Sequence, residues 1–247
     1  MWYNFAMHRL LVPEELMSGE AIALPDDAAR HLKVVRPRAG EEVELFDGHG
    51  RTRRCRWDGR RLVADGPATT FPAPQTELVL FACVTKGSRW DWTIEKAVEL
   101  GATRIVPVIS DRCIVRLPAA ERAAKADRWR RIAADAARQS DAVWLPEVLA
   151  AVDFPEALDL VKSCGRVFAG ALCKPPPPIW NEVASVADRA VPSLGIFVGP
   201  EGDFTPEELR ALLEVATPVS FGPTILRAET AAIFGLSVLA AARGRWT

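Results

Sequence analysis

The stretch LGIFVGPEGDFT, residues 194–205, is followed by a second stretch of the same design, PVSFGPTILRAET, residues 218–230. Each begins as an apolar strand, turns at a Gly-Pro loop and leads toward a helix. Glycine lets the backbone approach a ligand closely and proline fixes φ, so each loop is both open and stiff. Open α/β sheets bind small ligands in loops at the carboxyl ends of their strands. The two stretches therefore predict an α/β domain with a ligand site at one edge of its sheet.

The segments upstream of these loops predict the rest of a parallel sheet. In chain order, the expected elements are a buried strand over 78–84 that contains Cys83, a helix over about 91–100 that ends at Gly101, a strand over 104–108, a helix over about 119–140, and a strand over 166–169. In a strand-helix-strand unit of this kind the helix crosses back over the sheet, so the two strands are parallel and the crossover is right-handed.

Residues 8–70 follow a different pattern, in which short alternating strands are separated by turns. Asp47-Gly48 and Asp58-Gly59 each follow such a strand, and an Asp-Gly pair in this position is a strong hairpin signal. We therefore expect a small antiparallel barrel. The proline-marked linker at 71–75 ends it, which predicts two domains, residues 1–72 and residues 73–247.

Composition limits the class of protein. The 247 residues are 49% hydrophobic and 26% charged, as expected for a globular chain, and the longest apolar run, 231–242, is too short to span a bilayer. The five cysteines are scattered and the three histidines are far apart, which argues against a metal site and a disulfide framework. The N-terminus has no signal-peptide pattern. A soluble, cytoplasmic protein without a metal is expected.

Charge is unevenly distributed although the net charge is only −1. Between residues 30 and 61 the chain has ten Lys or Arg residues and five acids. Such a local basic excess is typical of a nucleic-acid contact surface. A solvated arginine-rich surface would give the same pattern, so both interpretations stay open at this point.

The two Gly-Pro loops differ in what they offer a ligand. Thr205-Pro206-Glu207-Glu208 has an N-cap, a first-turn proline and a capping-box acid, so the positive end of a helix lies against the first loop. The second loop contains Ile225-Leu226, and apolar residues there suit an adenine or another flat ring. Neither loop has the glycine pattern of a phosphate cradle, which disfavours nucleoside triphosphates and dinucleotides.

The motifs GPEG at 199–202 and LRAETA at 226–231 together resemble the family that methylates N3 of a uridine in 16S ribosomal RNA. This family belongs to the SPOUT class of S-adenosylmethionine-dependent methyltransferases. Further segments that fit it are HLKVVR at 31–36 through LFDG at 45–48, KGSR at 86–89 through ELGA at 99–102, and Arg112-Cys113. The resemblance covers nearly the whole chain in order. It departs from the family at Asp141-Ala142, where members commonly carry an arginine.

The resemblance implies a PUA-like N-terminal barrel that binds RNA, a SPOUT domain with a deep trefoil knot, and a homodimer. The implied cofactor is S-adenosylmethionine, and the implied target is uracil 1498 of 16S rRNA in the small ribosomal subunit. The helix over 230–242 is apolar nearly all round, which agrees with burial on more than one side. Two alternatives remain, a SPOUT methyltransferase for another RNA position and a non-catalytic RNA-binding factor for ribosome assembly.

The resemblance also indicates site residues. Those expected to bind the cofactor are Ala171, Leu172, Gly199, Glu201, Gly202, Phe221, Gly222, Ile225, Leu226, Arg227 and Thr230. Those expected to bind RNA are Arg9, Arg36, Arg51, Arg53, Arg54, Lys86, Arg89 and Lys96.

Two of the residues near the second loop are expected to be catalytic. N3 of uracil carries a proton at neutral pH, so the protein must position both reactants and help that proton leave. Arg227 could stabilise a uracil anion, and Glu229 is an available carboxylate, as is Glu201. Glu229 could equally serve as a helix N-terminal acid or an ion-pair partner of Arg227. The sequence assigns no general base.

Overall fold

The computed structural model describes residues 7–18, 22–171, 176–185 and 191–243. These form two compact units. The first contains residues up to Ala73 together with Ala134–Leu145, and the second contains Pro74–Ala133 and the residues from Pro146 onward. The chain passes from one unit to the other inside the expected linker at 71–75. Residues 134–145, which the sequence assigned to the second domain, are grouped with the first unit instead.

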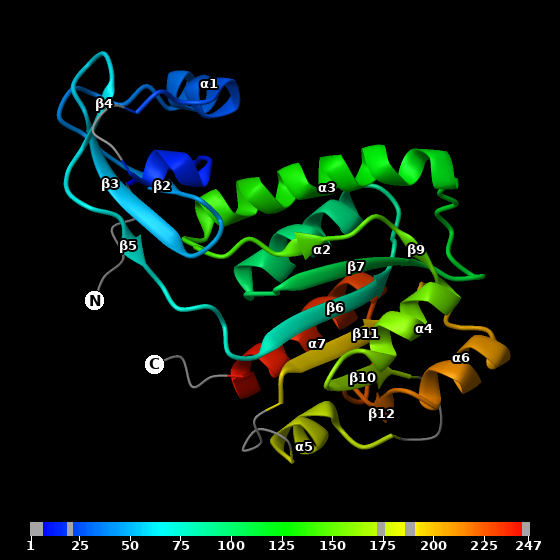
Figure 1. Ribbon diagram of the computed structural model, residues 1–247. Helices are drawn as coiled ribbons and strands as arrows, with labels where there is room; N and C mark the ends of the chain where they lie inside the picture. The colour runs from blue at the N-terminus through cyan, green and yellow to red at the C-terminus, as the bar shows by residue number, and fades with distance from the viewer. Residues whose placement is uncertain (1–6, 19–21, 172–175, 186–190, 244–247) are drawn as a thin grey trace. The chain divides into compact units, whose positions relative to one another are not determined.

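The second unit is built on a parallel sheet, as predicted (Figure 1). Its strands are, in spatial order, β12 (Thr217–Val219), β10 (Arg166–Gly170), β11 (Ser193–Val198), β6 (Glu77–Cys83), β7 (Arg104–Ile109) and β8 (Glu147–Val148), and β9 (Val152–Asp153) also pairs with β7. All of these pairs are parallel. Strands β6 and β11 are almost wholly buried, which agrees with their unbroken apolar sequences.

Helices cover both faces of this sheet, which is the usual way to bury parallel strands. They are α2 (Ser88–Glu99), α3 (Ala119–Gln139), α4 (Phe154–Lys162), α5 (Ile179–Ala184), α6 (Pro206–Leu213) and α7 (Ala228–Arg243). Helices α4 and α6 share one core cluster with alternate residues of the central strands, including Phe81 and Phe197. On the opposite face α7 lies close to β11, and a Cβ atom at Gly235 would be 2.6 Å from Ile196.

The first unit contains a five-stranded sheet of β1 (His8–Leu11), β2 (Glu42–Phe46), β3 (Arg51–Trp57), β4 (Leu62–Ala64) and β5 (Thr69–Thr70). The two predicted hairpins are present, because β2 pairs with β3 and β3 with β4 in antiparallel fashion. Strand β1 pairs with β2 in parallel, however. The intervening 3-10 turn η1 (Glu14–Met17) and helix α1 (Asp26–Val35) provide the crossover that a parallel pair needs.

Helix α1 (Asp26–Val35) was not predicted, since residues 8–70 were read as strands and turns. Its sequence does have helix signals, with two acids in the first turn and Lys33 in the last. Ala28 and Leu32, four residues apart, are buried in the core of this unit with Leu10, Val43 and Leu45.

Among the described residues, no helix is long and apolar enough to cross a membrane. The trefoil knot that the resemblance implies stays a prediction.

Candidate functional site

Three strands of the second unit, β10, β11 and β12, end side by side at the carboxyl edge of its sheet. Strand β10 pairs with β11 on one side and with β12 on the other, so the segments that follow these strands are neighbours. The Ala171 amide donates a hydrogen bond to the Val219 carbonyl at 3.3 Å. A Cβ atom at Gly170 would be 2.4 Å from the Phe221 ring, so a glycine is needed for this ring to pack there. Leu172 lies outside the described residues.

Gly222 has an open face in the loop that follows β12. Its φ of +123° favours glycine, and among the described residues no atom lies within 4 Å of the position that a Cβ would occupy. The Gly222 amide donates to the Ser220 hydroxyl at 3.2 Å, which fixes the turn. Farther along, Ile225 is 81% exposed. A bare backbone next to an exposed apolar side chain suits a ligand with a flat ring.

The loop after β11 carries the next candidates. Glu201 accepts a hydrogen bond from Arg89 at 3.2 Å, so an expected cofactor residue and an expected RNA residue are paired with each other. Thr205 caps α6 as predicted, because its hydroxyl accepts from the Glu208 amide at 3.1 Å and completes a capping box.

The expected catalytic residues lie where α7 begins. The Arg227 carbonyl accepts the Ala231 amide at 2.8 Å and the Arg227 residue is exposed. One carboxylate oxygen of Glu229, Oε2, is buried and has no hydrogen-bond partner among the described residues. The same holds for the hydroxyl of Thr85, two residues after β6. Because a buried polar atom without a partner is costly, these two atoms are suited to receive a polar group from outside the chain.

Two family models of RNA methyltransferases match the chain. Residues 72–240 match the family model of an RNA methyltransferase domain, and residues 24–56 match that of an RNA methyltransferase PUA domain. The chain belongs to the RNA methyltransferase family.

Relatives of this family are similar over most of their length. Ribosomal RNA small subunit methyltransferase E of Mycobacterium bovis is 31% identical over 245 residues, which cover 96% of this chain and 93% of that protein. The protein of that name from Synechocystis is 29% identical, with 95% and 78% covered. The crystal structure of ribosomal RNA small subunit methyltransferase E from Neisseria gonorrhoeae, bound to S-adenosyl methionine, has a TM-score of 0.82 and 31% identity over 98% of this chain and 100% of that one.

In this member of the RNA methyltransferase family, the expected RNA residues have different environments. Lys86, between β6 and α2, and Arg89, in the first turn of α2, are both exposed. Lys96 bonds Glu95 at 2.8 Å and Glu99 at 2.7 Å, and these two hydrogen bonds raise its pKa. In the first unit, the residues Arg36 and Arg54 are exposed, and Arg51 pairs with Glu14 at 2.9 Å.

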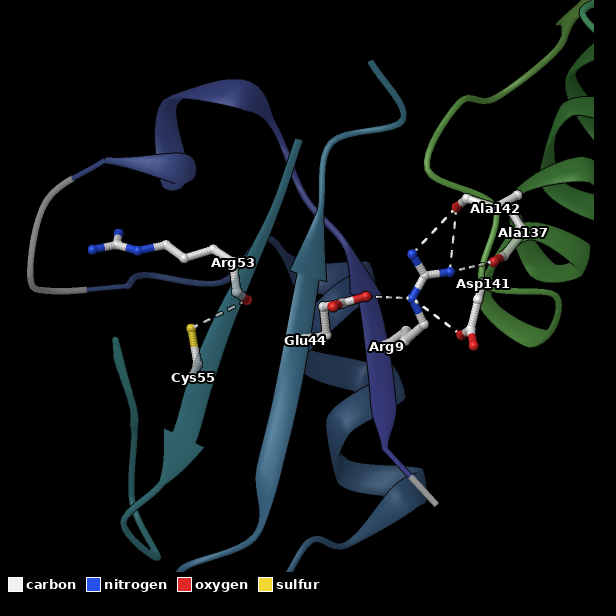
Figure 2. A network of polar contacts seen from close by, with 7 residues as sticks. All are labelled: Arg9, Glu44, Arg53, Cys55, Ala137, Asp141 and Ala142. Carbon is white, nitrogen blue, oxygen red and sulfur yellow. Dashed lines mark hydrogen bonds and ion pairs between the residues drawn. The ribbon is translucent and has the colours of Figure 1, made fainter. Parts of the chain in front are cut away.

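Arg9, which the sequence assigned to RNA binding, is buried, so its position does not favour a direct RNA contact (Figure 2). Its side chain is 1% exposed, its Nε donates to Glu44 at 2.8 Å, and its guanidinium lies 4.4 Å from the centre of the Phe46 ring. The same group donates to the carbonyls of Ala137 at 2.7 Å and Ala142 at 3.3 Å. Arg9 thus satisfies carbonyls at the C-terminal end of α3, where helices leave them without partners.

The departure from the family pattern at Asp141-Ala142 falls in this network. Asp141 has a φ of +56°, so the backbone is left-handed where α3 has ended, and Oδ1 of its carboxylate lies 3.6 Å from Nε of Arg9. Asp is among the residues that tolerate this conformation best. Asp141 and Ala142 therefore help to hold Arg9.

Arg53 is also buried, being 8% exposed, and its Nε donates to the Gly66 carbonyl at 3.1 Å. The sequence grouped it with Arg51 and Arg54 as one exposed basic cluster. Neighbouring side chains of a strand point to opposite faces of a sheet, so Arg53 and Arg54 face different environments. Arg54 is the exposed residue of the two.

Two residues that were not among the predicted site residues, Arg112 and Glu208, lie at the first Gly-Pro loop or directly after it. Arg112 donates to the carbonyls of Gly202 at 3.2 Å and Phe204 at 3.1 Å. Glu208 accepts the Asp111 amide at 2.9 Å. Arg112 lay in a segment that resembles the family, whereas Glu208 was recognised only as a capping residue.

Proposed function

We propose that this chain uses S-adenosylmethionine to methylate N3 of a specific uridine, uracil 1498, in 16S rRNA of the small ribosomal subunit. The proposal is carried by the carboxyl edge of the parallel sheet, where β10, β11 and β12 end side by side in a chain of the RNA methyltransferase family. A relative that aligns with 98% of this chain is known with S-adenosyl methionine bound.

The residues at this edge fit that cofactor. The open backbone of Gly222 and the apolar residues Ala171, Ile225 and Leu226 are suited to a nucleobase ring. The polar groups of the ligand would be held by the loop at 199–202 and by Thr230, and the buried oxygen of Glu229 offers an acceptor. S-adenosylmethionine supplies an electrophilic methyl group on a sulfonium.

The chain's own task is to hold the uracil and to stabilise N3 as its proton leaves. Holding two reactants in the reactive geometry can lower a barrier by about 7–11 kcal/mol. Arg227 is exposed beside the open loop, where its fixed charge would stabilise a uracil anion. Glu229 is assigned to the same site, in the first turn of α7.

Two alternative functions, a non-catalytic assembly factor and a methyltransferase for another RNA position, differ from the proposed one in cofactor binding or in the product. An assembly factor without activity would not need the open Gly222 face or the buried oxygen of Glu229. A methyltransferase for another RNA position would bind the cofactor and give a different modified nucleotide.

The proposal includes a homodimer with α7 near the interface. One side of α7 is buried against the sheet through residues such as Leu236 and Leu239, whereas Ile233, Phe234 and Val238 remain partly exposed. Partly exposed apolar residues on an apolar helix can be buried by a second copy. Light scattering at micromolar concentration should give twice the mass of 27.0 kDa, and a monomer would contradict this part.

Gly222→Val should lower the affinity for S-adenosylmethionine at least tenfold, about 1.4 kcal/mol. The branched side chain would occupy the open face at a φ of +123°, which strains the backbone. Titration calorimetry measures the change.

Gly66→Val is the matched control, because Gly66 has a φ of +110° and is equally open but lies in the first unit. Gly199 is a poorer test position, since a Cβ there would be 3.0 Å from the Phe204 ring. Equal affinity in folded Gly222→Val and Gly66→Val would reject the site.

Replacing Arg36 and Arg54 with Ala should weaken binding to the small subunit and flatten its salt dependence. Both residues are exposed in the unit that matches the PUA domain, and phosphate contacts release counterions. The slope of log affinity against log salt should fall by about 0.7–0.9 for each phosphate that is no longer neutralised. Filter binding at several salt concentrations measures the slope.

The control pair Lys162→Ala and Arg210→Ala removes two exposed charges from α4 and α6 of the second unit. Its slope should stay at the wild-type value. If both pairs gave the wild-type slope, Arg36 and Arg54 would be solvated surface residues only.

A further inference from the structure

The first Gly-Pro loop is held from outside by the turn that follows β7. In this turn, residues 110–113, the Arg112 side chain reaches the loop and donates to the carbonyls of Gly202 and Phe204 at 3.2 and 3.1 Å. The Cβ of Arg112 is also 3.4 Å from the position that a Cβ of Gly202 would take, so the turn and the loop lie in close contact. One guanidinium nitrogen therefore bridges two carbonyls on either side of Asp203, whose φ is +58°.

Glu208 also connects the end of the loop to the turn at residues 110–113. This carboxylate is buried, with the residue 8% exposed, and each oxygen has a separate partner. Oε2 accepts the Thr205 amide at 3.0 Å, which is the usual capping-box bond within α6. Oε1 accepts a hydrogen bond at 2.9 Å from the amide of Asp111, which lies 97 residues earlier in the chain. A capping box alone needs only the first of these bonds, so the second indicates an additional role.

The turn that makes both connections is itself firmly anchored. The Cys113 amide donates to the Ser110 carbonyl at 3.1 Å, and the Ser110 amide donates to the Cys113 sulfur at 3.3 Å. The Ser110 hydroxyl lies 3.4 Å from the Cys83 sulfur and 3.3 Å from the Cys113 sulfur. Ser110, Cys83 and Cys113 are all 2% exposed. The turn is thus fixed to the core between the ends of β6 and β7.

We infer that Arg112 and Glu208 are positioning residues that hold the Gly199–Phe204 loop in its binding conformation and thereby set the affinity for the cofactor. This inference rests on the proposed function, because the loop carries Gly199, Glu201 and Gly202 of the proposed cofactor site. A loop that is already ordered loses less conformational entropy when a ligand binds, so removing its supports weakens binding. The supports act through the loop backbone, and the chemical step should depend on them little once the cofactor is saturating.

Arg112→Ala and Glu208→Gln should each raise the dissociation constant for S-adenosylmethionine about tenfold in the full-length protein, as measured by titration calorimetry. With subunits as substrate, KM for the cofactor should rise by a similar factor while kcat stays within about threefold of wild type. Arg112→Lys keeps one donor and should recover part of the affinity. Hydrogen exchange of the 199–205 segment should become faster in both weakened variants, without a change in the strands β6 and β7.

The controls are Glu207→Gln and Arg210→Ala, which alter exposed residues of the same helix, α6, that make neither connection. Both should bind the cofactor as wild type does. Lower kcat with unchanged KM, or unchanged affinity in Arg112→Ala and Arg112→Lys alike, would overturn the inference. Because Arg112 is exposed, these two variants also decide the matter if Glu208→Gln fails to fold. A wild-type protein that bound no S-adenosylmethionine would instead reject the proposed function.

Discussion

Arg227→Ala is expected to lower kcat for subunit methylation at least 100-fold. Arg227 is an exposed cation that follows the open Gly222 loop and directly precedes α7. Removing one preorganised group that stabilises developing negative charge typically costs about 100- to 1,000-fold in kcat. The affinity for S-adenosylmethionine should fall less, since the loop backbone and apolar residues remain. Transfer of a labelled methyl group to small subunits, at saturating cofactor, measures the effect.

Arg227→Lys and Arg210→Ala are the matched variants for this experiment. Lysine keeps the charge but not the planar donor pattern, so Arg227→Lys should retain part of the lost activity. Arg210, an exposed arginine of α6, should be replaceable without loss. Wild-type kcat in Arg227→Ala would remove Arg227 from the catalytic assignment.

Arg9→Ala is expected to destabilise the first unit by about 3–5 kcal/mol, the cost of removing one partner from a buried ion pair. The substitution would leave the Glu44 carboxylate, whose side chain is 15% exposed, without its cation. The carbonyls of Ala137 and Ala142 would lose their donor too. The free energy of unfolding of this unit is measured by hydrogen exchange of β1 and β2 at increasing urea concentrations.

Arg56→Ala provides the comparison within the same sheet. Arg56 pairs with Asp65 at 3.1 Å, but both side chains are about half exposed, and surface ion pairs contribute less than about 1 kcal/mol. If Arg9→Ala were no less stable than Arg56→Ala, the buried network would not hold residues 134–145 on the first unit.

The sequence predicted those parts of the structure whose signals are local. The strand over 194–198, its Gly-Pro loop and the Thr205 cap all follow from adjacent residues, and β11 and α6 confirm them. The hairpins at Asp47-Gly48 and Asp58-Gly59 are confirmed for the same reason, because each turn is stabilised by its own aspartate.

What the sequence missed depends on distant partners. Charge alone cannot show which arginines are exposed, and Arg9 is buried because of carbonyls about 130 residues later in the chain. Glu208 was recognised as a cap from its neighbour Thr205, but its bond to Asp111 spans 97 residues and leaves no local signal. Helix α1 was missed because the hairpin signals around it outweighed its short amphipathic pattern.

The position of the methyl group in the product distinguishes the proposed function from its alternatives. Small subunits from a strain that lacks the N3-methyl group on 16S rRNA are incubated with the wild-type protein and S-adenosylmethionine, and the rRNA is mapped by mass spectrometry. We expect one new methyl group, on N3 of a single uridine. Methylation of another position or ring atom, or no methylation by a protein that is folded and binds the cofactor, would contradict it.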